Sequence, residues 1–178
     1  GAKPYRGILT GFNEAFLIDN ATKESLINRD PNCESIIRPY LRGQDVERWQ
    51  PEWQQLWMIA IKSSENHNWA WADAGDDAES IFAKSYPSLF EHFDGHRDRL
   101  VKRQDQGRYW WELRSCAYWN AFEQPKILYQ DIMWTPSFCL DTQARMTNNT
   151  VYFISSPTPW LLAVLNSPAL WWFSWRRA

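Results

Sequence analysis

The sequence has 178 residues, of which 44% are hydrophobic and 22% are charged, which suffices for one globular domain and excludes a disordered chain or a fibrous repeat. The formal net charge of -2 excludes a chain that attracts nucleic acid or an anionic membrane by its overall charge. Thirteen tryptophans are an unusually large share, and they predict either a large aromatic core or flat side chains on which a ligand stacks.

The N-terminal part predicts short strands and one short helix. Residues 5–18 alternate loosely between apolar and polar side chains, which favours a hairpin or a bulged strand pair around Gly11. Asp19 is placed to cap a helix that runs through Ile27. A turn at residues 30–32 precedes an extended segment that ends at Gly43, and the continuous apolar run within residues 55–61 predicts a buried strand.

The clearest helical pattern lies between residues 85 and 101. Its apolar residues recur on one face, Ser85 is placed to cap the N-terminus, and Pro87 is tolerated in the first turn. Basic residues gather at the other end, where Arg99, Lys102 and Arg103 are expected on one side of the helix. Cations at this end also complement the helix dipole, and that effect alone could explain them.

The C-terminal part predicts strands followed by two helices. Strands are expected at residues 126–129, 137–140 and 151–154, one helix at residues 160–166, and another from Pro168 onward. No internal repeat or low-complexity linker interrupts the sequence. We therefore expect one domain over residues 1–178, of the α/β class in its α+β form, with a mixed β-sheet and packed helices.

The cysteines and the chain ends predict the setting of the protein. Three cysteines lie far apart in no paired spacing, which argues against a disulfide framework and favours a reducing, cytoplasmic environment. No apolar stretch is long enough for a membrane span, so we expect no membrane partner. The missing initiator Met and the aromatic residues that end the sequence indicate a piece of a longer protein.

Familiar cofactor and catalytic motifs are missing from the sequence. No two glycines stand two positions apart, so no glycine-rich loop for a dinucleotide or S-adenosylmethionine is expected, and there is no Gly-Lys pair for a P-loop. There is no Pro-Pro pair, although many amino-methyltransferases of nucleic acid use a Pro-Pro-aromatic box to hold the target amine. No lysine follows an acidic residue by two positions, as common metal-dependent nucleases require. We therefore expect no catalytic residue and no cofactor in this chain.

The sequence contains an incomplete metal-binding pattern and leaves three broader functions open. His92 and His96 are spaced to share a metal ion, but no third ligand is placed to complete the site, so no metal is expected. Arginine outnumbers lysine 13 to 6, which favours planar recognition of phosphate or guanine. A DNA-binding module, a carbohydrate- or protein-binding module with tryptophan platforms, and a hydrolase with an unfamiliar site all remain open on composition alone.

Several sequence blocks resemble a known family. Residues 36–48 read Ile-Ile-Arg-Pro-Tyr-Leu-Arg-Gly-Gln-Asp-Val-Glu-Arg. A similar block precedes them at residues 7–16, and further ones follow in the family's order at residues 86–103, 107–113, 125–127 and 161–167. Together these blocks resemble the TaqI-like C-terminal specificity domain, the target-recognition part of type IIG and related restriction-modification enzymes. The resemblance implies that the chain recognises double-stranded DNA for a catalytic domain that it does not contain.

The resemblance also implies what the parent enzyme does. The parent is expected to be a prokaryotic adenine-specific DNA methyltransferase that uses S-adenosylmethionine and, where a nuclease is present, Mg²⁺ for cleavage. The parent's methyltransferase domain is the expected intramolecular partner. Trp171, Trp172 and Trp175 are the residues we expect to face it.

Seven residues within or near these blocks are candidate DNA contacts. Arg42 and Arg48 could instead pair with Asp45 or Glu47, and a tight turn explains residues 10–13 equally well. The basic candidates suit phosphate or guanine, whereas the polar ones suit phosphate or adenine. The full set is Thr10, Asn13, Arg42, Arg48, Arg103, Arg108 and Lys126.

Overall fold

The computed structural model describes residues 3–176, and its internal contacts divide the chain into two units. Unit 1 comprises Gly1–Ile8, Tyr40–Gln54 and Tyr118–Ala178, and unit 2 comprises Leu9–Pro39 and Gln55–Ala117. Each unit is therefore assembled from segments that lie far apart in the sequence. The single domain expected for residues 1–178 stays a prediction.

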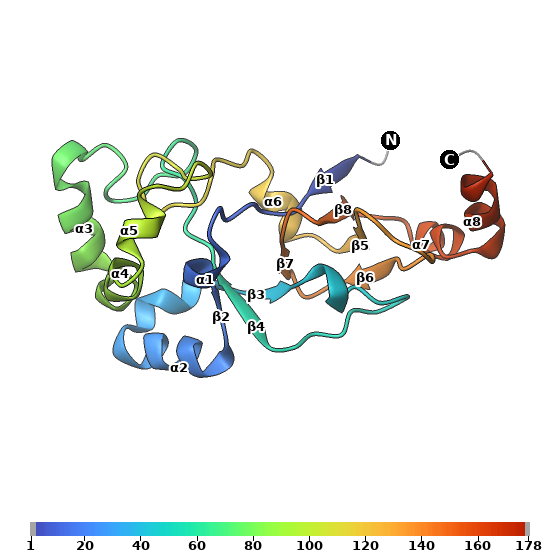
Figure 1. Ribbon diagram of the computed structural model, residues 1–178, viewed down its shortest axis with the longest axis horizontal. Coiled ribbons are helices and arrows are strands. Elements are labelled where there is room, and N and C mark those ends of the chain that lie inside the picture. Colours follow the sequence, from blue (N-terminus) through green and yellow to red (C-terminus); the bar gives the residue numbers. More distant parts are fainter. Residues whose placement is uncertain (1–2, 177–178) are drawn as a thin grey trace. The chain divides into compact units, whose positions relative to one another are not determined.

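Unit 1 is built on an antiparallel sheet. Its strand order is β1 (Pro4–Arg6), β8 (Val151–Ser155), β5 (Lys126–Gln130) and β6 (Cys139–Asp141), as Figure 1 shows. The register pairs Lys126 with Asp141 and Gln130 with Val151. These strands confirm the three predicted in the C-terminal part, two of which, β5 and β8, carry β-branched and aromatic side chains in apolar runs.

Short elements surround this sheet. Helices α6 (Trp119–Phe122), α7 (Pro159–Leu165) and α8 (Pro168–Trp175) belong to unit 1, and the last two confirm the predicted C-terminal helices. The Ser167 side chain caps α8 by accepting a hydrogen bond from the Leu170 amide at 3.2 Å. Strand β3 (Ile37–Leu41) confirms the predicted extended segment, and its last two residues pair in parallel with β7 (Met146–Thr147).

Unit 2 contains most of the helices. Strand β2 (Leu17–Ile18) pairs antiparallel with β4 (Leu56–Ile59), which confirms the buried strand predicted at residues 55–61. Asp19 accepts a hydrogen bond from the Thr22 amide at 2.8 Å, as predicted for the cap of the first long helix. The helical elements of unit 2 are α1 (Asn13–Phe16), α2 (Asn20–Arg29), η1 (Pro31–Ser35), η3 (Gly75–Asp77), α3 (Ala78–Ser85), α4 (Pro87–Asp94) and α5 (Arg97–Leu100).

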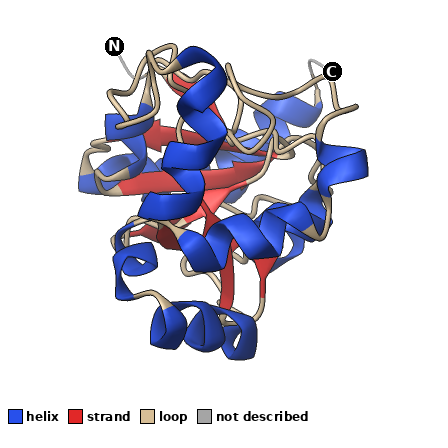
Figure 2. Cartoon of the chain, turned by 90° about the vertical axis from the view of Figure 1, so that its left-hand side faces the viewer, coloured by secondary structure: helices blue, strands red, loops and turns tan. Residues whose placement is uncertain are grey.

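Helices and strands therefore both contribute substantially to the fold (Figure 2). Antiparallel and parallel strand pairs both occur, which confirms the α+β class with mixed pairing. Within residues 3–176, none of the helices combines the length and the apolar character needed to span a bilayer.

The hairpin predicted around Gly11 is wrong. Phe12, Ala15 and Phe16 are buried and stand at i, i+3 and i+4, the spacing of one helical turn, and they form the buried side of α1. Gly11 itself has a φ of 69°, a left-handed backbone conformation that ends the extended segment before this helical turn. The short segment satisfies both a strand-like and a helix-like pattern, and packing selects the helical turn.

The long helix predicted at residues 85–101 is also wrong, because it is divided into α4 and α5. Pro87 occupies the first turn of α4, and Tyr86, not Ser85, is its N-cap residue. Helix α4 ends at Asp94, with Gly95 as its C-cap residue. The amide of His96 then donates a hydrogen bond to the Phe93 carbonyl at 2.9 Å, a three-residue step that departs from the four-residue pattern of an α-helix. The apolar stripe continues in phase across this break, which hides it from the sequence pattern.

Aromatic side chains form the core of unit 2. Trp71 and Trp111 are almost fully buried, and Trp111 stacks on Phe82 with ring centres 5.0 Å apart. Tyr109 also stacks on Trp111, with ring centres 4.8 Å apart. The buried Glu112 carboxylate accepts hydrogen bonds from the Trp71 indole at 2.9 Å and from backbone and hydroxyl groups nearby. Much of the aromatic excess therefore serves packing.

A close backbone approach at Gly7 provides a test of packing in unit 1. A Cβ at Gly7 would lie 2.0 Å from the Asn148 carbonyl oxygen, whereas a Cβ at Gly95 would make ordinary contact at 3.5 Å. We expect Gly7→Ala to lower the free energy of unfolding by at least ~2 kcal/mol, because backbone atoms cannot move aside cheaply. Gly95→Ala should change it by no more than about 1 kcal/mol. Urea unfolding measures both, and equal stabilities of the two variants would contradict the described packing.

Candidate functional site

Three loop segments of unit 1 lie beside one another at one end of its sheet. They are residues 42–44 at the start of the 3₁₀ helix η2 (Gly43–Asp45), residues 131–138 between β5 and β6, and residues 148–150 before β8, and together we call them the loop cluster. The last two segments flank strands that pair with each other, so the sheet itself brings them to the same end. The side chains of the cluster are mostly polar, and each is either half-buried or exposed.

Hydrogen bonds join the three segments. The Gln130 side-chain amide donates to the Gly43 carbonyl at 2.7 Å, and the Asp131 amide donates to the Thr150 carbonyl at 2.9 Å. A Cβ at Gly43 would approach the Thr150 hydroxyl to 3.1 Å, so glycine permits this close packing. The positions of the three loops are therefore coupled.

The last segment of the cluster is fixed further by β1. The Arg6 guanidinium donates from Nε to the Asn149 carbonyl at 2.8 Å and lies 5.9 Å from the Tyr152 ring centre. The Asn148 side chain accepts a hydrogen bond from the Thr150 hydroxyl at 2.7 Å, which shapes the turn. Arg6 therefore places a positive charge beside this turn.

Arg42 of the predicted set lies in the loop cluster. Its guanidinium donates to both oxygens of Asp45, with Nη2 to Oδ1 at 2.8 Å, and its backbone amide also donates to this carboxylate. Hydrogen bonding to Asp45 raises the pKa of Arg42. The Asp45 side chain is 3% exposed, whereas the Arg42 side chain is 38% exposed. The pairing that we weighed as an alternative is therefore present, and it leaves part of the guanidinium at the surface.

Arg48 lies elsewhere in unit 1. Its Nη2 donates to the Asn166 carbonyl at 2.7 Å, and the guanidinium carbon is 5.1 Å from the Trp49 ring centre. The Asn166 side chain is buried and pairs with both backbone groups of Phe138, at 3.1 and 2.8 Å. Arg48 therefore contacts the junction of α7 and α8, and Asn166 fixes the end of the β5–β6 loop.

Lys126 has a structural role in this fold. Its side chain is fully buried, and Nζ donates to Asp141 Oδ2 at 2.7 Å and to the Phe122 carbonyl at 2.8 Å. Burial raises the pKa of Asp141, but the charge and hydrogen bonds of Lys126 and Arg145 outweigh it, so the pKa lies below its usual value. We therefore do not retain Lys126 among the proposed DNA contacts.

Arg103 is also buried, in the interior of unit 2. It is 7% exposed and donates to the backbone carbonyls of Thr10, Trp110 and Glu112. Burial lowers its pKa to about 10, although nearby carboxylates oppose that change. These bonds explain its position without a ligand, and we do not retain it either.

The predicted basic face at residues 99–103 does not form. Arg99 and Lys102 are exposed, but Arg103 points into the core, so the three do not share one side of a helix. The structure does bring Arg103 together with the predicted Thr10 and Asn13, because Thr10 donates from its hydroxyl to Asn13 Oδ1 at 2.6 Å. Thr10 is buried, and Asn13 is exposed at the start of α1.

Arg108 lies apart from that group. Its Nη1 donates to the Ala72 carbonyl at 2.6 Å and pairs with Asp73 at 3.2 Å, and the side chain stays 43% exposed. This contact links two loops of unit 2 and leaves Arg108 partly accessible.

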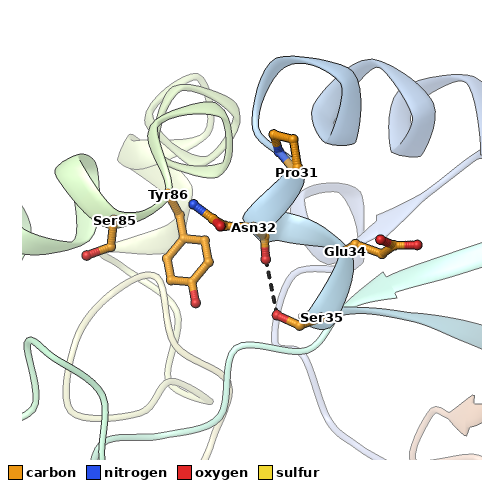
Figure 3. Close-up of a pocket in the computed structure, with 6 residues that line it drawn as sticks. All are labelled: Pro31, Asn32, Glu34, Ser35, Ser85 and Tyr86. Atoms are coloured by element: carbon orange, nitrogen blue, oxygen red, sulfur yellow. Dashed lines mark hydrogen bonds between the residues drawn. The ribbon is translucent and has the colours of Figure 1, made fainter.

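Unit 2 also has an open pocket of about 510 Å³. Figure 3 shows Asn32 and Tyr86 on its two sides, with the Ser35 hydroxyl bonded to the Asn32 carbonyl at 3.1 Å. Among the described residues that line it, Glu34 is the one charged residue, so this lining offers a phosphate group no cation. We do not assign the candidate site to it.

Groups suited to metal binding or nucleophilic catalysis were also located. Within residues 3–176, no three His, Cys, Asp or Glu side chains are placed to hold a metal ion, and His92 bonds the Ala15 carbonyl at 2.8 Å. Cys33, Cys116 and Cys139 are all buried. Burial raises the pKa of Cys33 to about 11 and that of Cys139 to about 12, so their thiols stay protonated near neutral pH.

The loop cluster includes residues that we had not predicted. Gln44, Asn149 and Trp134 carry side chains able to meet a ligand. Gln44 lies in the block at residues 36–48 but was not among the candidate contacts, whereas Asn149 and Trp134 lie outside all of the similar blocks. The available signal was the Asn-Asn-Thr sequence at residues 148–150 and the Thr-Pro pair that follows Trp134. That signal marks loops but does not show that they lie together.

Comparisons with known proteins agree with this architecture. The sequence matches the family described as the TaqI-like C-terminal specificity domain over residues 38–176. Among solved structures, the type IIL restriction-modification enzyme MmeI in complex with DNA matches with a TM-score of 0.64 at 13% identity. That match covers 94% of this chain and 21% of the MmeI chain. Among curated proteins, none is similar enough to count as a relative.

The structural role of Lys126 can be separated from a contact role by stability. Lys126→Ala removes a fully buried ammonium and leaves Asp141 with one cation fewer, so we expect the free energy of unfolding to fall by about 3 kcal/mol. The matched control, Lys102→Ala, removes an exposed lysine and should change it by less than about 0.5 kcal/mol. Chemical denaturation measures both. Equal stability of the two variants would return Lys126 to the candidate contacts.

Proposed function

The chain belongs to the family of TaqI-like C-terminal specificity domains, and from this premise we propose that it recognises a specific sequence in double-stranded DNA. The loop cluster is the proposed contact surface. It holds Arg42 and Gln44 on one of its three coupled segments and Asn149 on another, together with the charge of Arg6 beside them. The observation that carries the proposal is this joining of arginine and amide side chains at one end of a rigid sheet.

The side-chain chemistry of the cluster suits base reading. Arginine can donate to two acceptors of guanine or to phosphate, whereas glutamine and asparagine can pair with adenine through one donor and one acceptor. Thr150, through its hydroxyl, and the backbone amides of the turns would hold phosphates. The pairing of Arg42 with Asp45 orients the guanidinium and lowers the entropy lost on binding.

The weak net charge is compatible with this proposal. A domain that is covalently joined to another DNA-binding domain meets the duplex at a high effective concentration, so it needs little charge attraction of its own. The MmeI match is consistent with such an arrangement, because this chain corresponds to about a fifth of that enzyme's length. Specificity then comes from the loops, and general affinity comes mainly from the rest of the parent.

We extend the proposal to the parent protein. It would be a cytoplasmic, prokaryotic, adenine-specific DNA methyltransferase, with a nuclease activity as a further option. S-adenosylmethionine, and Mg²⁺ for a nuclease, would bind outside this chain, because no residues here match the required motifs. The half-exposed Trp171 and the more exposed Trp172 and Trp175 of α8 would face the parent's methyltransferase domain.

The carbohydrate- or protein-binding alternative is not favoured. Trp71 and Trp111, two of the thirteen tryptophans, are committed to the core. Of the exposed tryptophans, Trp172 and Trp175 share α8, whereas Trp49, Trp134 and Trp160 lie on three other segments, so they do not line one continuous element. The family match also provides no support for sugar binding.

Substitutions in the loop cluster test the proposed contact surface. In the full parent enzyme, we expect Gln44→Ala and Asn149→Ala each to weaken discrimination between its methylated site and a single-mismatch duplex by about 5- to 150-fold. Arg42→Gln should lower the salt dependence of binding by about one counterion. Fluorescence anisotropy at several salt concentrations measures both quantities.

The matched control is Lys84→Ala, which removes an exposed cation from α3 of unit 2. It should leave discrimination and salt dependence unchanged. If all three loop variants behave like this control while remaining folded, the loop cluster is not the contact surface and the proposal fails.

A further inference from the structure

The β5–β6 loop presents two large apolar side chains to solvent. Trp134 is 88% exposed and Ile132 is 78% exposed, which makes them the most exposed of the large hydrophobic side chains within the described residues. Both occupy the middle segment of the loop cluster. Exposure of two large apolar side chains to water is unfavourable, and burying them against a partner would remove that cost. Their exposure therefore indicates an interaction site.

The loop that carries these side chains is held firmly at both ends. At its start, the Asp131 amide bonds the Thr150 carbonyl at 2.9 Å, next to the bond from Gln130 to Gly43. At its end, the backbone of Phe138 is bound by the Asn166 side chain and also accepts a hydrogen bond from the Trp49 amide at 2.9 Å. Pro136 restricts the backbone between these points. Trp134 is therefore an apolar group on a supported loop.

The polar surroundings of the loop indicate the kind of partner. Arg42, Gln44 and Asn149 belong to segments that are hydrogen-bonded to the same stem, and Arg6 bonds to one of them. Apolar side chains that enter DNA between base pairs are characteristically flanked by groups that bind the phosphates and base edges on either side. The exposed Asp131 is a carboxylate that suits a cytosine amino group better than a phosphate.

We propose that Trp134 inserts as a wedge at a base step of the recognised duplex, with Ile132 packing against the sugar edge beside it. This inference rests on the proposed function, because it takes double-stranded DNA as the partner of the loop cluster. The wedge would unstack one base step and bend the duplex toward the neighbouring polar loops. It would also contribute specificity, because flexible pyrimidine–purine steps are easier to open than others.

The test uses the full parent enzyme and duplexes that contain the site it methylates. Single 2-aminopurine substitutions are placed along the site, except at the target adenine, because base flipping would itself raise the fluorescence there. The wedge predicts one step at which binding raises the fluorescence. Trp134→Ala should abolish that rise and weaken binding about 10-fold, whereas Trp134→Phe should keep most of both.

Trp160→Ala is the matched control, since it removes another exposed indole, from α7. It should leave the fluorescence and the affinity unchanged, and thermal melting should show that all variants are folded. If Trp134→Ala retains the fluorescence rise and the affinity, the wedge is overturned. The Gln44→Ala and Asn149→Ala results judge the proposed function separately, so a failed wedge and a failed DNA surface give different patterns.

Discussion

The buried ion pair between Lys126 and Asp141 is the constraint on which the placement of the loop cluster depends. These residues are direct partners in the register of β5 and β6, and both side chains are inaccessible to solvent. A slip of one residue would turn a buried charge to the other face and leave its partner unpaired, at a cost of several kcal/mol. The pair therefore fixes where the β5–β6 loop leaves the sheet. At the far end of the same strand, Gln130 ties that loop to Gly43.

The sequence allowed the individual elements to be predicted better than their assembly. Strands at residues 126–130 and 151–155 were predictable from their apolar runs, and α2 from the capping Asp19. The hairpin predicted around Gly11 was wrong because a segment this short fits both the two-residue period of a strand and the 3.6-residue period of a helix. The loop cluster was missed apart from Arg42, because the bond that joins Gln130 to Gly43 spans 87 positions and no local pattern contains it.

Several arginines have a structural role besides the recognition role that composition indicated. Arg103 satisfies three backbone carbonyls inside unit 2, and Arg97 joins Glu79 to Asp94, so these cations hold loops and helices together. The tryptophans have two different roles. Trp71 and Trp111 belong to the core, whereas the side chain of Trp134 is exposed to solvent. The proposed contact surface consequently relies on a few amide and arginine side chains and one exposed indole, a composition suited to reading bases more than to attracting phosphates.

Hydrogen–deuterium exchange of the parent enzyme, with and without a duplex that carries its methylated site, tests most directly whether the loop cluster meets DNA. The account predicts slower exchange on DNA binding in peptides that contain residues 42–44, 131–138 and 148–150. Peptides from α3 and α4 should keep their exchange rates. Protection confined to unit 2, with these three segments unchanged, would contradict the central claim.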